Sequence, residues 1–273
     1  MGEQAALERV PEPVTVDSLV GEFRDLGVES GQTLLVHSSL SALGWVAGDA
    51  QAVVDALREA VTPEGTLVMP THTPQYTDPA VWSNPPVPDD WVDTIRAERP
   101  AFDPGRTPTR GMGAVPECFR AYPDVRRSRH PVFSFAAWGA DAEAVVDDHD
   151  LAYSMGERSP LARVYEREGD VLLLGVGHGV NTSLHLAEYR ADVDAAEITR
   201  EAPVRRDGDR VRVTFEDIET TTEDFPAVGG AFEDDQRHDV DVSRGTVGAA
   251  EARLVDQPAL VDFAVDWFEE HRE

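Results

Sequence analysis

The chain has 273 residues, of which 41% are hydrophobic, 52 are Asp or Glu and 24 are arginine, with no lysine. The formal net charge of -28 argues against nucleic acid as a partner. The missing lysine excludes a lysine Schiff base and a P-loop lysine. The single cysteine, Cys118, excludes an internal disulfide and a cysteine-based zinc site.

The acidic residues are spread along the whole chain and are not collected in one tail. Molar salt shortens the electrostatic screening length to about 3 Å and so relieves the repulsion among so many carboxylates. We therefore expect a halophilic protein, whereas an acidic surface for a basic partner is the weaker alternative. No apolar run approaches the roughly 18 residues of a membrane span and no signal peptide is recognisable. These features predict a cytoplasmic protein with no membrane association.

The first elements in chain order have the pattern of a βαβ unit. They are an amphipathic helix over 15–27, a strand over 33–38, a helix over 50–61 with Asp49 as its N-cap, and a strand over 66–70. The first strand ends at His37 and Ser38, and the second leads into Thr71, His72 and Thr73. Polar residues at strand ends are where open α/β sheets bind ligands.

Residues 74–110 are rich in proline and aromatic residues and have no sustained period. We expect an ordered lid loop in which Trp82, Trp91 and Phe102 are buried or meet a ligand. The elements predicted after it are helices over 113–122, 140–148, 159–168 and 259–272, a helix that begins near Asn181, and strands over 132–139, 170–177, 198–204, 210–217 and 244–256. This order favours a single domain over 1–273, an α/β/α sandwich around a mixed central sheet.

His185 is the strongest candidate for chemistry. Asn181 or Thr182 can cap its helix, so His185 falls in the first turn and Glu188 lies three residues further on the same face. The positive end of the helix dipole disfavours the imidazolium, and a carboxylate on one ring nitrogen fixes the tautomer. These are the properties of a general base, although a capping histidine beside a surface glutamate has the same pattern.

Three further groups of residues are weaker candidates because each also has an ordinary structural explanation. Ser38 and Ser39 after the first strand, Thr71 and Thr73 after the second, and the glycines of 109–113 can grip an anion or simply make turns. A metal-dependent hydrolase built on His37, His72, His178 and His185 is an alternative, but no HExxH or similar spacing supports it. We expect no metal.

In their order along the chain, several segments closely resemble the aminoglycoside 3-N-acetyltransferase family. They are LLVHSSLSALGWVAG, GTLVMPTHT, the DPAVW that begins at Asp78, PAFDPGRTPTRGMGAVPECFR, SRHPVFSFAAWG, GERSPLARVYEREGDVLLLGVGHGVNTSLHLAEYRA and VGAAEARLVDQPALVDFAVDWF. The resemblance implies direct transfer of an acetyl group from acetyl-coenzyme A to a small-molecule amine, an activity associated with antibiotic resistance. A protein that binds coenzyme A but lacks catalysis is a further alternative, and a homodimer is one candidate assembly.

The resemblance also implies residue roles. His185 matches the general base and Glu188 the residue that orients it. The coenzyme would be lined by Ser38, Ser39, Leu40, Ser41, Gly44, Val46, Arg110, Met112 and Gly113. The acceptor amine would meet Asp78, Asp103, Glu157 and Asp224. In that setting residue chemistry makes the hydroxyl of Thr71 or Thr73, or a nearby loop amide, a candidate donor to the oxyanion.

One position departs from the family's pattern. The family often has paired glycines before the second helix, whereas this chain has AGD, with Asp49 in the second place. A carboxylate there competes with a phosphate for the amides of the helix N-terminus. We therefore expect Asp49 to weaken coenzyme binding, unless the pyrophosphate lies elsewhere.

Overall fold

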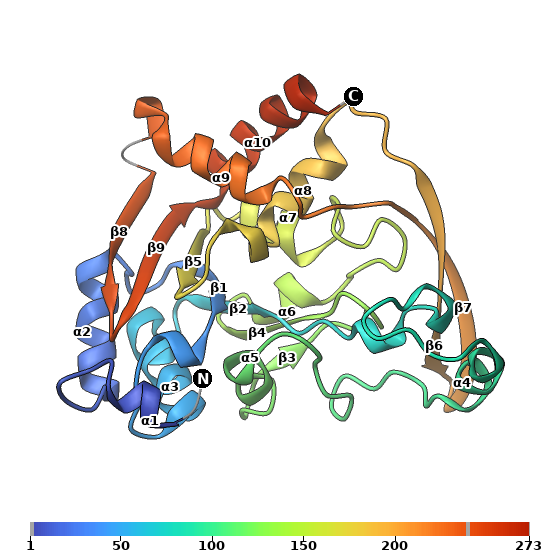
Figure 1. The fold of residues 1–273 in the computed structure, drawn as a ribbon, viewed down its shortest axis with the longest axis horizontal. Helices are drawn as coiled ribbons and strands as arrows, with labels where there is room; N and C mark the ends of the chain where they lie inside the picture. The colour runs from blue at the N-terminus through green and yellow to red at the C-terminus, as the bar shows by residue number, and fades with distance from the viewer. Residues whose placement is uncertain (1–2, 239–240, 273) are drawn as a thin grey trace.

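The computed structural model describes residues 3–238 and 241–272, and within them seven strands form one mixed sheet (Figure 1). Their order across the sheet is β3-β4-β2-β1-β5-β9-β8. The strands are β1 (Thr33–Ser38), β2 (Thr66–Pro70), β3 (Arg126–Arg127), β4 (Phe135–Gly139), β5 (Asp170–Leu174), β8 (Val242–Val247) and β9 (Ala250–Asp256). Strand β1 pairs in parallel with β2 and β5, and the outer pairs are antiparallel.

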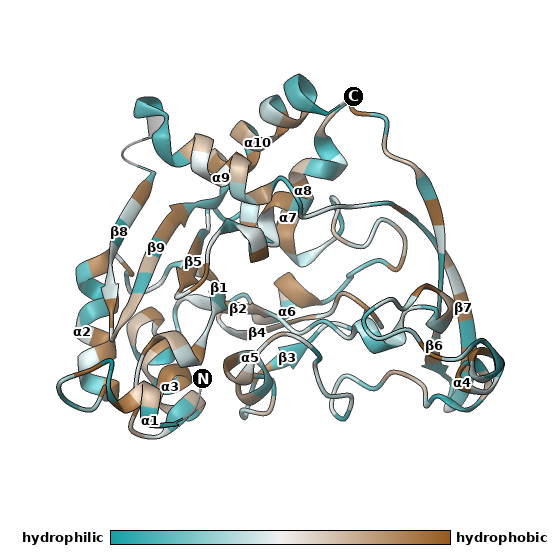
Figure 2. Ribbon diagram, in the orientation of Figure 1, coloured by the Kyte–Doolittle hydropathy of each residue, from teal (hydrophilic) through white to brown (hydrophobic). Residues whose placement is uncertain are grey.

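Helices cover both faces of the sheet because successive residues of a strand point to opposite sides. Leu34 and Val36 of β1 pack with the helices of one face, and Leu35 between them packs with those of the other. Strand β5 is accordingly hydrophobic along most of its length (Figure 2). The first face carries α2 (Val16–Leu26), α3 (Asp49–Val61) and α5 (Ala114–Phe119). The second carries α6 (Ala142–Val146), α7 (Pro160–Tyr165), α8 (Ser183–Arg190), α9 (Phe225–Asp234) and α10 (Gln257–His271).

Strand β1 is the point at which the order of strands across the sheet changes direction. Helix α3 carries it from β1 to β2 on one side, whereas β5 pairs with the other edge of β1. The carboxyl ends of β1 and β5 therefore border a crevice of the kind in which open α/β sheets bind ligands. Three short segments contribute residues to this crevice: α1 (Glu3–Leu7), η1 (Leu40–Ala42) and η5 (His178–Val180). A fourth, η6 (Gln236–His238), follows α9.

A two-stranded hairpin stands apart from the central sheet and holds the lid. Its strands are β6 (Glu197–Arg206) and β7 (Asp209–Ile218), joined at Asp207 and Gly208, which both have positive φ as a tight hairpin turn requires. The lid contains η2 (Pro74–Tyr76), η3 (Pro79–Val81), η4 (Asp89–Trp91) and α4 (Val92–Glu98). Tyr76 and Phe102 from the lid pack with Phe215 of β7 in a small core of their own. The hairpin and α4 lie on the right of Figure 1.

The structure confirms the mixed sheet between helical layers, and the strands predicted over 33–38 and 66–70 have those bounds. Helix α2 begins after Thr15 and ends before Gly27, as predicted. Several predicted bounds were wrong. The helix predicted over 140–148 spans only Ala142–Val146, and the strand predicted over 170–177 ends at Leu174. Gly48, not Asp49, is the N-cap of α3; α5 ends already at Phe119; and β4 begins only at Phe135. Of the lid aromatics, Phe102 is buried but Trp91 is 57% exposed.

Candidate active site

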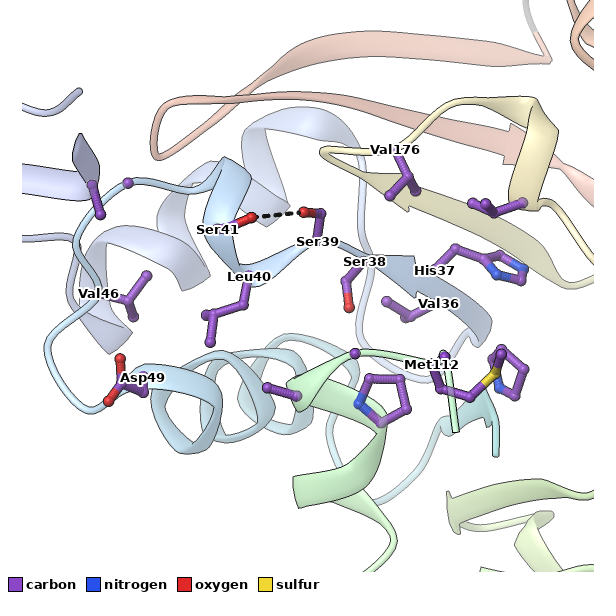
Figure 3. A pocket seen from close by; sticks show the side chains of 18 of the residues that line it. Val36, His37, Ser38, Ser39, Leu40, Ser41, Val46, Asp49, Met112 and Val176 are labelled. Carbon is purple, nitrogen blue, oxygen red and sulfur yellow. Dashed lines mark hydrogen bonds between the residues drawn. The ribbon is translucent and has the colours of Figure 1, made fainter. Parts of the chain in front are cut away.

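A cavity of about 800 Å³ opens where β1 and β5 end. It extends along η1 to the start of α3, with the start of α5 on its other side. In Figure 3, His37 lies at the right-hand end of the row of side chains and Asp49 at the left. The lining residues are Glu3, Ala6, Val36, His37, Ser38, Ser39, Leu40, Ser41, Gly44, Trp45, Val46, Asp49, Pro70, Gly111, Met112, Gly113, Ala114, Pro116, Val176, Val180 and Thr182.

Most residues that the family resemblance assigns to the coenzyme line this one cavity. They are Ser38, Ser39, Leu40, Ser41, Gly44, Val46, Met112 and Gly113. Arg110 is not among them: its side chain is exposed and its main-chain N–H donates to the carbonyl of His72 at 3.1 Å. The Oγ of Ser38 is buried and has no hydrogen-bond partner in the described chain. An orphaned hydroxyl on a cavity wall fits a site built to bind a polar ligand.

The charge of the cavity is unusual for a site that binds phosphates. Apart from His37, its ionisable side chains are the carboxylates of Glu3 and Asp49, and no arginine lines it within the described residues. Asp49 is the first residue of α3 and has φ 51°, a left-handed conformation that favours glycine. The carboxylate thus lies where the positive end of α3 would otherwise attract an anion.

His185 and Glu188 form the pair that the sequence predicts. The Nδ1 of His185 lies 2.5 Å from Oε2 of Glu188, and both residues are buried, 8% and 4% exposed. The other ring nitrogen, Nε2, has no hydrogen-bond partner within the described chain and keeps some exposure. The ring packs edge-on against Phe225, with 4.9 Å between the ring centroids. A histidine held in this way has one nitrogen fixed by a carboxylate and the other free to exchange a proton.

His37 connects this pair to the cavity. It lines the cavity, and its Nε2 lies 3.4 Å from the main-chain nitrogen and 3.3 Å from the hydroxyl of Thr182, which precedes the helix of His185. Burial, together with His185 and His178 nearby, lowers the pKa of His37 to about 3. Burial, and after it the nearby ring of His185, holds the pKa of His72 well below its usual value. Both rings are therefore neutral at physiological pH.

Thr71 and Thr73 are not placed to donate to an oxyanion. Both are fully buried, and their hydroxyls donate to the carbonyls of Ser134 at 3.0 Å and Pro131 at 2.6 Å. Arg127 further fixes Thr71, since its Nη2 donates to the Thr71 carbonyl at 2.6 Å. The sequence-based assignment of a donor role to either threonine is inconsistent with these contacts, because a hydroxyl has a single proton to donate.

Each acid assigned to the acceptor amine lies beside an arginine. Asp78 pairs with Arg96 at 2.7 Å, Asp103 with Arg106 at 3.9 Å, Glu157 with Arg190 at 2.7 Å and Asp224 with Arg272 at 2.7 Å. Asp78 belongs to the lid and Glu157 pairs with the end of α8, so the four carboxylates do not share one element. Their attraction for a polyamine is partly neutralised within the protein.

Several residues at the site have no signal in the sequence. The cavity walls from Glu3 and Ala6 come from α1, which carries no motif. Arg272, which donates to Glu188 at 2.8 Å, lies 84 residues away along the chain.

No group of three or more His, Cys, Asp or Glu side chains suited to a metal occurs in the part of the chain that the structure describes. Likewise, no described helix is long and apolar enough to cross a bilayer.

Comparison with known proteins identifies the family. The aminoglycoside 3-N-acetyltransferase family model matches residues 35–269. The aminoglycoside N(3')-acetyltransferase-like protein YokD of Bacillus subtilis is 46% identical, covering 94% of this chain and 93% of YokD. Its crystal structure superposes with a TM-score of 0.93 at 43% identity, covering 97% of each chain.

Two further proteins agree with this match. Aminoglycoside N(3)-acetyltransferase VII of Streptomyces paromomycinus is 39% identical over 99% of this chain and 96% of its own. A structure described as AAC-IIIb binary with CoASH has a TM-score of 0.85 at 31% identity, covering 96% of this chain and 98% of that one. The chain therefore belongs to the aminoglycoside 3-N-acetyltransferase family, enzymes that transfer an acetyl group to an amine.

Proposed function

We propose that this enzyme transfers the acetyl group of acetyl-coenzyme A directly to a small-molecule amine, with His185 as the general base. The observation that carries the proposal is the ring of His185, bound to Glu188 through Nδ1 and free at Nε2, in the helix that begins at the cavity wall. The similar AAC-IIIb binds coenzyme A, which supports the same ligand for the cavity. Ser38 offers an unpartnered hydroxyl to it.

The residues divide the chemistry between them. Acetyl-coenzyme A supplies a thioester carbonyl, and the amine must be uncharged before it can attack that carbon. His185 takes the amine proton on Nε2 while Glu188 stabilises the imidazolium that forms. The new C–N bond replaces the C–S bond, and the proton held by His185 can pass to the departing thiolate. No covalent acyl-enzyme is needed.

The acceptor is a small amine. The similar AAC-VIa binds sisomicin, an aminoglycoside, which supports a polyamine acceptor and an antibiotic-resistance activity for this enzyme. The paired state of Asp78, Asp103, Glu157 and Asp224 lowers the attraction that this surface exerts on multiple positive charges. A metabolic amine with fewer charges is therefore included among the acceptors to be tested.

The net charge of -28 further supports a salt-rich cytoplasm as the working environment. We expect transfer to be weak at about 0.1 M KCl and strong at about 2 M, because salt screens both the carboxylates of the fold and those of the cavity from the coenzyme phosphates. The assay measures free thiol released from acetyl-coenzyme A with aminoglycosides and small metabolic amines at both salt concentrations. Coenzyme binding without thiol release for any amine would contradict the enzymatic function. Equal rates at the two salt concentrations would contradict the proposed adaptation to high salt.

Replacing Asp49 with Gly is expected to tighten coenzyme A binding about threefold to tenfold at low salt, because it removes a carboxylate from the start of α3. The glycine also suits the positive φ at this position, so thermal stability should not fall. Calorimetric titration with coenzyme A measures the effect. Glu59→Gln, which removes a charge from an exposed position on the same helix, is the control; equal changes in both variants would contradict a local role for Asp49.

A further inference from the structure

Glu188 has more partners than the imidazole that it orients. Its Oε2 lies 2.5 Å from His185, and its Oε1 accepts hydrogen bonds from Nη1 of Arg272 at 2.8 Å and from the main-chain N–H of Thr221 at 3.0 Å. The side chain is 3% exposed. One carboxylate oxygen thus serves the catalytic pair, and the other is fixed by two donors.

Arg272 is itself held firmly. Its guanidinium donates two hydrogen bonds of 2.7 Å to the two oxygens of Asp224, and it lies 3.7 Å from the centroid of the Phe268 ring. Its side chain is 18% exposed. The residue follows α10 and lies beyond residue 269, where the match to the family model ends. The guanidinium of Arg272 is thus fixed between the carboxylates of Asp224 and Glu188, and it contacts the Glu188 oxygen that does not contact His185.

We propose that Arg272 is a positioning residue for acetyl transfer, which fixes the carboxylate of Glu188 toward His185 and limits how readily the imidazole is protonated. The proposal rests on the proposed role of His185 as general base. It also gives Asp224 a second role, because both of its oxygens are occupied in holding Arg272. An amine acceptor that approaches Asp224 therefore meets an existing ion pair.

The charges around His185 determine the direction of the effect. Glu188 contacts His185 on the same helix, and Arg272 and Asp224 follow it in one chain of ion pairs. The rings of His37 and His72 lie close enough to interact electrostatically with His185, and His178, which is paired with Glu233, interacts with His37. Burial lowers the pKa of each of these three histidines, so they are neutral. Arg272 is then the cation that offsets the two carboxylates. Removing Arg272 favours the imidazolium form of His185. As the pH is lowered, the variant therefore loses activity at a higher pH than the wild type does.

The test compares Arg272→Gln with Arg167→Gln. Arg167 is a matched control, because its side chain is 23% exposed and its hydrogen bonds go to Asp141 at 3.0 Å and to the carbonyl of Arg163 at 2.9 Å, not to the residues of the site. Arg272→Gln is expected to lower kcat about tenfold, since a hydrogen bond to a charged group is lost. The acid limb of its kcat/KM profile should move up by about half a unit to one pH unit. Arg167→Gln should keep the wild-type rate and profile.

Two further variants make the outcomes distinct. Arg272→Lys keeps the positive charge but loses the planar, bidentate hydrogen bonding of the guanidinium. The acid limb of its pH profile should therefore match the wild type while kcat falls. If Arg272→Gln does not fold, a wild-type kcat in Arg272→Lys overturns the proposal. A folded Arg272→Gln with the profile and rate of Arg167→Gln also overturns it. His185→Asn is measured alongside. If that variant still turns over, the proposed base is wrong; if it is inactive while Arg272→Gln behaves like the wild type, only the role of Arg272 fails.

Discussion

Replacing His185 with Asn is expected to lower kcat by about 10²- to 10⁴-fold, the usual contribution of a general base. Asparagine is smaller than histidine, but its amide NH₂ can still donate a hydrogen bond to Glu188 as Nδ1 does, and it cannot take a proton from the amine at neutral pH. The His185 side chain is not part of the cavity wall, so the affinity for coenzyme A should be unchanged. Thiol release measures the first effect and calorimetry the second.

His271→Asn is the control for this experiment. His271 is exposed at the end of α10, where its ring stacks on Trp267 at 4.1 Å between centroids, so its loss should leave transfer intact. Undiminished turnover in His185→Asn would remove this residue from the mechanism. Loss of coenzyme binding together with turnover would show instead that the substitution had disturbed the cavity.

The parts of the fold that could be predicted are those set by local pattern. The apolar run that forms β1 ends at His37 and Ser38, and both are found at the cavity. The three-residue spacing of His185 and Glu188 brings the pair together because residues i and i+3 share a face of a helix. Glycine followed by aspartate explains the start of α3, although the prediction placed the cap one residue late.

The parts that could not be predicted depend on contacts between distant segments. No periodicity near Arg272 indicates that it meets Glu188, because the contact depends on how α10 crosses α8. The hydroxyls of Thr71 and Thr73 have the right chemistry to donate to an oxyanion. Their direction, however, is set by the main-chain carbonyls of Ser134 and Pro131, to which they donate. Proximity in sequence to a strand end identifies a residue as available, and only the packing determines where its polar atom points.

Replacing Glu188 with Gln is expected to reduce kcat by about 10²-fold or more, because neither orientation of the amide satisfies all three partners. If the amide oxygen accepts from Arg272 and Thr221, the amide NH₂ faces Nδ1 of His185. That arrangement places the ring proton on Nε2, so the base has no free lone pair for the amine. The reverse orientation turns the NH₂ group toward two donors and leaves them unpaired.

The double variant His185→Asn/Glu188→Gln separates this mechanism from a general loss of structure. If Glu188 acts through His185, its kcat should equal that of His185→Asn alone, since residues that act as a unit are not additive. Glu233→Gln is the matched control, because Glu233 is 14% exposed and lies 3.0 Å from His178 in a second histidine–glutamate pair. It should lower the melting temperature and leave kcat unchanged. Effects that add in the double variant would mean that Glu188 contributes independently of the imidazole, as a carboxylate for the acceptor amine and not as the group that orients the base.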